Sequence, residues 1–144
     1  MTMFYTSFAI VVFSSVLYHI SQRTIAPGAH PVISLIVTYL VAIGLSTILL
    51  LVFPLRTSLR EAIGELNRAS LVLAVAIVGL EIGFLLAYRA GWNVSLAGVA
   101  TNVAGALVLL PVGIAFFKER PSALNLVGVV VCLLGLWMVN HRPG

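Results

Sequence analysis

The hydrophobic positions of this chain form five long runs separated by polar segments. The runs cover about residues 4–20, 31–53, 70–89, 94–117 and 122–139. Each contains about 17–24 residues, which is the length that an α-helix needs to cross a hydrocarbon core roughly 30 Å thick. Stretches such as LIVTYLVAIGLSTILLLVF are apolar on every face of a helix. The pattern therefore predicts an all-α polytopic membrane protein with five transmembrane helices, forming a single domain over residues 1–144.

The polar segments are short, with one exception. Residues 54–69 read PLRTSLREAIGELNRA, and their apolar side chains recur at helical spacing opposite charged ones. We expect an amphipathic helix over about residues 57–68 that lies at the membrane interface, and a solvated loop is the alternative. The last two runs are separated by Lys118-Glu119-Arg120-Pro121, a charged break with a proline suited to starting a helix. We therefore expect two helices there.

An odd number of spans places the chain ends on opposite sides of the membrane. Lys and Arg in short loops gather on the cytoplasmic side. Five of them fall on the side of the N-terminus and three on the other side: Arg56, Arg60, Arg68, Lys118 and Arg120, against Arg23, Arg89 and Arg142. The bias predicts a cytoplasmic N-terminus, and a margin of two charges is small enough for some copies to insert inverted.

The composition agrees with this interpretation. Hydrophobic residues make up 61% of the chain and charged residues 8%, whereas a soluble domain carries about 25% charged residues. The net charge of +4 does not indicate a nucleic-acid partner, because the cations lie at span ends, where membrane proteins collect them.

The first residues lack the basic region and cleavage site of a secretory signal, so we expect a retained first span. The single Cys132 is expected to be a small packing residue.

No pattern in the chain is typical of an enzyme. His, Cys and acidic residues do not occur at metal-ligand spacing. Ser14, Ser15 and His19 have no acid near them in the sequence to complete a catalytic triad. We therefore expect a protein that is not an enzyme and that holds neither a metal nor a cofactor.

Glu81 is the acidic residue that lies near the middle of a span. A carboxyl group at that depth costs several kcal/mol unless it is paired or protonated, so it marks a candidate functional site. Such a group can bind a proton or a cation and exchange one for the other. The alternative is a structural hydrogen bond between helices. Phe84 and Tyr88 share its helix face, and aromatic rings beside an acid can hold an organic cation.

Other polar residues near this span are candidates for a cavity mouth. Arg89 lies eight residues from Glu81, which is roughly 12 Å along a helix and too far for a direct ion pair. It is expected to reach lipid head groups or to contact an anionic part of the substrate. Trp92 and Tyr88 are also suited to an interfacial aromatic belt. In the first span, His19 lies near the end, where an interfacial role competes with that of a proton relay.

Small and polar residues mark faces on three of the spans. Ser14 and Tyr18 belong to a polar stripe on the first span, which either lines an aqueous cavity or forms interhelical hydrogen bonds. On the fourth span, Asn102 lies among small residues and is expected to contact substrate, with helix packing as the alternative. Gly128 and Gly135 lie on one face of the last span, which favours a helix partner there.

Residues 83–140 resemble the EamA-type domain of the drug/metabolite transporter superfamily. The resemblance lies in a span end with alanine and aromatic residues, a span rich in small residues, the hinge Lys118-Glu119-Arg120-Pro121-Ser122, and a last span with Gly128 and Gly135. The earlier spans fit by hydropathy and order. Many EamA members carry a proline early in the fourth span, where this chain reads Ala100-Thr101-Asn102.

This resemblance implies that one chain is half of a ten-helix transporter. Typical members have two five-span halves in opposite orientations, with the substrate passing between them near the midplane. An antiparallel homodimer, or a pair with an oppositely oriented paralogue, supplies both halves. The small multidrug-resistance transporters are four-span relatives that look like a precedent, and their last-span glycine pair is similar to Gly128 and Gly135. Their essential glutamate lies in the first span, whereas Glu81 lies in the third.

We therefore expect a multi-pass transporter subunit of the bacterial inner membrane. It would move a small metabolite or drug-like solute by alternating access, with Glu81 exchanging a proton or cation. Tyr88, Asn102, Ser14 and Tyr18 are expected to line the cavity. The alternatives are a subunit that flips lipid-linked substrates and an accessory membrane subunit that transports nothing.

Overall fold

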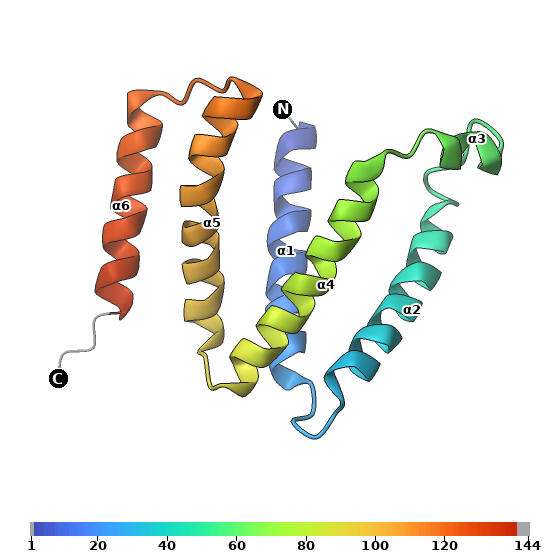
Figure 1. Cartoon of the computed structure of the whole chain (residues 1–144), viewed down its shortest axis with the longest axis horizontal. Coiled ribbons are helices and arrows are strands. Elements are labelled where there is room, and N and C mark those ends of the chain that lie inside the picture. The colour runs from blue at the N-terminus through green and yellow to red at the C-terminus, as the bar shows by residue number, and fades with distance from the viewer. Residues whose placement is uncertain (1, 141–144) are drawn as a thin grey trace. The chain divides into compact units, whose positions relative to one another are not determined.

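The computed structural model describes the backbone of residues 2–140 and the side chains of residues 2–138 (Figure 1). Arg142, which entered the count of loop charges, lies outside the described residues. Within the described range the chain is helical, with no strands. The helices are α1 Thr2–Thr24, α2 Pro31–Leu49, α3 Leu59–Gly64, α4 Arg68–Arg89, α5 Val94–Phe117 and α6 Ala123–Asn140.

Four of the described helices, α1, α2, α4 and α5, are long and apolar enough to cross a membrane. The fold is thus that of a helical membrane protein, as the hydrophobic pattern predicts. The helix α6 is also apolar and has 18 residues. At 1.5 Å per residue it rises about 27 Å, slightly less than the roughly 30 Å of a typical hydrocarbon core.

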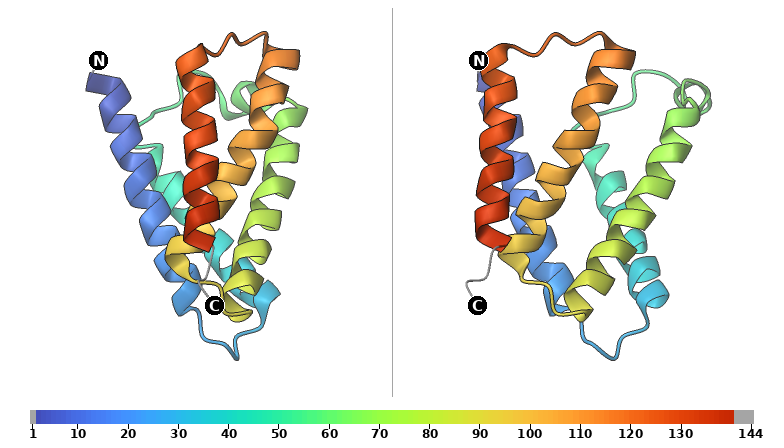
Figure 2. Two further views of the ribbon diagram at one scale, coloured as in Figure 1. Left: turned by 90° about the vertical axis from the view of Figure 1, so that its left-hand side faces the viewer. Right: turned by 60° about the vertical axis from the view of Figure 1, so that its left-hand side comes forward.

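The chain divides into two compact units, Met1–Ala90 and Gly91–Gly144. In the first unit α4 packs against both α1 and α2. The three helices converge at the end of the unit where the connection between α1 and α2 lies (Figure 2). The second unit is the helical pair of α5 and α6.

Local sequence signals explain where the helices of the first unit begin. Pro31 occupies the first turn of α2, where its missing N–H has no helical partner to lose. Asn67 caps α4 by accepting a hydrogen bond from the Ala69 N–H at 2.9 Å. The first helix continues to Thr24, four residues beyond the apolar run that predicts it. Its last turns therefore carry polar side chains.

The long connection contains a helix, α3, that is shorter than the predicted 57–68. Ser58 and Glu61 form a capping box at its start. The Ser58 N–H donates to Glu61 Oε2 at 3.0 Å, and the Glu61 N–H donates to Ser58 Oγ at 3.3 Å. These bonds satisfy two of the backbone donors that a helix start leaves unpaired, which gives so short a helix a defined beginning.

In the second unit the apolar runs form separate helices. Lys118 ends α5 in a left-handed conformation, with φ 54° and ψ 31°. The Gly113 carbonyl accepts from the backbone N–H groups of Lys118 and Glu119. The Glu119 carboxylate lies against Gly113, at the place where a larger residue would put its Cβ. Ser122 then accepts from the Asn125 N–H at 3.2 Å, at the start of α6.

Candidate functional site around Glu81

The carboxyl group of Glu81 has a hydrogen-bond partner on another helix. Gln22 on α1 donates from Nε2 to Glu81 Oε2 on α4. Glu81 is half-buried, and Gln22 is 5% exposed. Both helices belong to the first unit and pack against each other. A polar pair of this kind lowers the cost of holding a carboxyl group within an apolar span.

Gln22 is a site residue that the sequence interpretation missed. The residue falls in the segment interpreted as a connection, because the apolar run ends at about residue 20. A signal for it exists in the sequence: Gln22 lies four residues after Tyr18 and eight after Ser14, so it continues the polar stripe on the same helix face. It belongs to α1 because that helix continues to Thr24.

Two buried polar atoms near Glu81 have no hydrogen-bond partner among the described residues. They are Gln22 Oε1 and the hydroxyl of Tyr39 on α2. Tyr39 is half-buried and lies within electrostatic range of Glu81. Buried polar atoms are nearly always bonded, so an unpaired one indicates a place where a proton, water or ligand group can be received.

Aromatic rings from α1 and α4 form a cluster beside this pair. The Tyr18 and Phe84 rings meet edge to face at 5.6 Å between centroids, and His19 meets Phe84 in the same way at 4.8 Å. Phe84 and Tyr88 are stacked at 6.0 Å. Edge-to-face and offset pairs are the favoured aromatic geometries. The cluster therefore fixes the α1–α4 contact on the helix face that carries Glu81.

Hydrogen bonds tie this cluster together. The Tyr88 hydroxyl and His19 Nδ1 are 2.8 Å apart, and Tyr88 is 2% exposed. The Tyr18 hydroxyl donates to the Leu80 carbonyl at 3.3 Å. Tyr18, His19, Glu81 and Tyr88 are thus brought together in one region of the first unit.

Two arginines secure the end of α4 next to this region. Arg23 donates to the Tyr88 carbonyl at 2.5 Å. Arg89 donates to the Ala29 carbonyl at 2.6 Å and more weakly to the Ala26 carbonyl at 3.5 Å. The last carbonyls of a helix lack helical partners and favour cations, and Arg23 pairs with one of them at the end of α4. The bonds of Arg89 fasten the connection between α1 and α2 to α4.

The remaining predicted residues lie apart from these bonds or in the other unit. Ser14 is exposed on α1. Trp92 and Asn102 are exposed residues of the second unit. At Gly128 and Gly135 an added Cβ would meet no atom of the described residues within 4 Å. The predicted small-residue face of α6 is therefore open at these positions.

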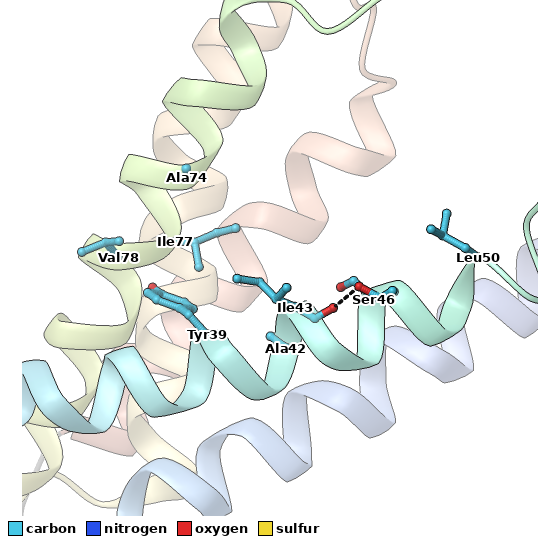
Figure 3. Close-up of a pocket in the computed structure, with 9 residues that line it drawn as sticks. Tyr39, Ala42, Ile43, Ser46, Leu50, Ala74, Ile77 and Val78 are labelled. Carbon is cyan, nitrogen blue, oxygen red and sulfur yellow. Dashed lines mark hydrogen bonds between the residues drawn. The ribbon is translucent and has the colours of Figure 1, made fainter. Parts of the chain in front are cut away.

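An open groove of about 610 Å³ lies between α2 and α4 (Figure 3). Apolar side chains make up most of its lining, which comprises Tyr39, Ala42, Ile43, Ser46, Thr47, Leu50, Ala74, Ile77 and Val78. The residues expected to line a cavity, Ser14, Tyr18, Tyr88 and Asn102, are not part of this lining. Ile77 and Val78 precede Glu81 by four and three residues, so the groove and the carboxyl group share a face of α4.

No group of three His, Cys, Asp or Glu residues suited to a metal ion occurs in the described part of the chain. The site instead offers a carboxyl group, an amide, hydroxyls and one imidazole. These groups can bind protons, cations and hydrogen-bonding parts of a ligand. In comparisons with known proteins, no family model, no curated protein and no solved structure matches the chain.

Proposed function

We propose that the chain is a subunit of a membrane transporter of the EamA type, and that it moves a small metabolite or drug-like solute by alternating access. The observation that carries this proposal is the Glu81 carboxyl group, held by Gln22 within an apolar helix that is long enough to span a membrane. Ionisable residues in such helices are rare and usually serve a transport path.

In this proposal Glu81 couples transport to a proton or a cation. The carboxyl group releases its proton when it faces one side of the membrane and takes one up when it faces the other. The side chains of Tyr18, His19 and Tyr88 belong to the cluster between α1 and α4 and give the binding region aromatic faces and hydroxyl groups. Such groups contact an organic solute through apolar area as well as through hydrogen bonds.

The proposal includes five spans and an antiparallel homodimer in the bacterial inner membrane. With α6 as the fifth span, the chain ends lie on opposite sides, and two inverted copies complete a ten-helix transporter. The open face at Gly128 and Gly135 supports close approach of a partner helix. A neighbouring paralogue of opposite orientation would serve in place of the second copy.

Topology is testable by labelling. In a Cys132→Ala background, a single cysteine placed near the C-terminus is treated with a membrane-impermeant thiol reagent in intact and in permeabilised cells. An antiparallel homodimer requires part of the population to react from each side. Labelling from one side only would rule out the homodimer and leave the paralogue pair.

Transport is testable in proteoliposomes that contain a pH-sensitive dye. Solutes are first chosen by their ability to raise the thermal stability of the purified protein. We expect an active solute to drive proton movement in the unchanged protein, and Glu81→Gln to abolish it. Glu65→Gln is the matched control because Glu65 lies in the connection before α4, outside the spans. Full proton-coupled transport by Glu81→Gln would refute the coupling role.

The groove between α2 and α4 favours a second candidate, a subunit that moves lipid-linked substrates. Its volume of about 610 Å³ and its apolar lining suit a hydrocarbon chain, since ligand sites commonly measure about 300–1,000 Å³. A fluorescent-lipid flipping assay in the same liposomes distinguishes this candidate from solute transport. Absence of both activities would favour an accessory membrane subunit.

A further inference from the structure

We propose that Gln22 is a positioning residue that holds Glu81 in both of its protonation states, donating from Nε2 to the carboxylate and accepting at Oε1 from the carboxylic acid. This inference rests on the proposed function, in which Glu81 gains and loses a proton. Two observations carry it: the bond from Gln22 Nε2 to Glu81, and the buried Gln22 Oε1 that has no partner among the described residues.

The Gln22 amide can bond to the Glu81 carboxyl group in either protonation state, because the amide carries both donors and an acceptor. An ionised carboxylate only accepts hydrogen bonds, whereas a protonated one also has an O–H to donate. The glutamine amide carries two N–H donors and a carbonyl acceptor on the same planar group. When Glu81 takes up a proton, a half-turn of the Gln22 amide replaces its N–H donors with Oε1. The last torsion of a glutamine is broad and roughly two-fold, so this turn needs little rearrangement.

The other α1 groups near Glu81 are already engaged. Tyr18 donates its hydroxyl to the Leu80 carbonyl and also interacts with Gln22. His19 shares its Nδ1 with the Tyr88 hydroxyl, and Arg23 donates to the Tyr88 carbonyl. These bonds leave the Gln22 amide as the α1 group with a buried acceptor available to a protonated carboxyl group.

The remaining groups come from α2 and from α4 itself. Tyr88 is bonded to His19, and Arg89 donates to the connection between α1 and α2. From α2, Tyr39 presents a buried hydroxyl without a partner among the described residues. Tyr39 is therefore the rival to Gln22 as the partner of protonated Glu81, and the experiment has to separate the two.

The chain contains a single glutamine, so one isotope label reports on Gln22 alone. The unchanged protein is prepared with glutamine labelled at the side-chain carbonyl carbon and amide nitrogen and is placed in lipid nanodiscs. Both signals are followed by NMR from pH 4 to pH 9, without any added solute. We expect the carbonyl and amide signals to change together in one step, because Gln22 switches from donor to acceptor as Glu81 is protonated.

Two variants identify the origin of the step. Glu81→Met removes the carboxyl group and is expected to abolish the step, whereas Tyr39→Phe is expected to preserve it. The inference is overturned if Gln22 shows no step, if the step persists in Glu81→Met, or if Tyr39→Phe removes it. A response to sodium or ammonium ions at constant pH in place of the pH step would also overturn it, because Oε1 would then serve a cation.

This readout is independent of transport. A step at Gln22 in a protein that moves no solute would support the inference and count against the proposed function. Proton-coupled transport by a protein whose Gln22 signals do not change with pH would support the function and refute the inference.

Discussion

Replacing Tyr88 with Phe tests the hydrogen bond that joins α1 and α4 beside Glu81. The substitution removes one hydroxyl and retains the ring that stacks on Phe84 at 6.0 Å. The lost interaction is the 2.8 Å bond between the hydroxyl and His19 Nδ1. The change therefore isolates a polar contact with little loss of buried apolar area.

The expected cost follows from the surroundings of the two groups. A neutral hydrogen bond contributes about 1 kcal/mol to folding, and interhelical bonds in membranes average about 0.6 kcal/mol with a maximum near about 1.7 kcal/mol. Tyr88 is 2% exposed, which places its bond in dry surroundings and argues for the upper part of this range. His19 is only half-buried and can find another partner, which reduces the cost. We expect Tyr88→Phe to lower the free energy of unfolding by about 0.5–1.5 kcal/mol.

The measurement is a double-mutant cycle with Tyr88→Phe and His19→Phe, because both changes preserve an aromatic ring. Unfolding in SDS is followed by circular dichroism for the unchanged protein, both single variants and the double variant. The coupling energy is expected to match the cost of Tyr88→Phe. Tyr88→Ala serves as a comparison and should cost about 3–5 kcal/mol, because it also removes the buried ring.

A coupling energy near zero, with both single variants destabilised, would refute an energetic contribution from the bond between Tyr88 and His19. The two side chains would then act independently, and the contact between α1 and α4 would owe nothing to this bond. An unchanged or raised stability of Tyr88→Phe would lead to the same conclusion.

Two further predictions concern helix ends. Hydrogen bonds from the Ser58 backbone, and secondly from the Ser58 hydroxyl, hold the pKa of Glu61 below its ordinary value. The contribution of ionised Glu61 to the stability of α3 is therefore present above the unfolded pKa and is lost as the pH falls through the lower folded pKa. Hydrogen exchange at the Ala62 amide, corrected for its intrinsic rate, should accelerate in the unchanged protein as the pH falls below the ordinary pKa of a glutamate. A Glu61→Gln protein with the same pH dependence would contradict this. Lys118→Gly should stabilise the chain against SDS by about 1 kcal/mol because Lys118 has a left-handed φ of 54°. Lys118→Ala removes the same charge but retains a Cβ, so equal stabilisation by both variants would assign the effect to charge.

Several parts of the fold are predictable from local patterns. The helix limits Val94–Phe117 agree with the apolar run at 94–117, because a charged break follows the run directly. The Ser58–Glu61 capping box is also a signal written within four residues. Helix limits are less predictable where a helix continues beyond its apolar run. The helix α1 is an example, because it continues through polar residues to Thr24.

The candidate site also contains residues that are predictable from local patterns and residues that are not. Glu81 stands out in the sequence because a carboxyl group within an apolar run is costly wherever the helix packs. Its face neighbours Phe84 and Tyr88 follow from the helical repeat. The partners on α1 do not follow, since interhelical contacts depend on how helices pack. Arg89 illustrates the limit, because its carbonyl acceptors belong to a connection 60 or more residues earlier in the chain.

The sequence by itself determined that this chain is helical and suited to a membrane, because hydrophobic runs and helix caps act over neighbouring residues. It also singled out Glu81. The tertiary structure alone decided that Gln22, 59 residues away, is the partner of that carboxyl group. The reason is physical: a helix can extend past its apolar run when its polar side chains find buried partners on another helix, and only the packing of α1 against α4 supplies those partners.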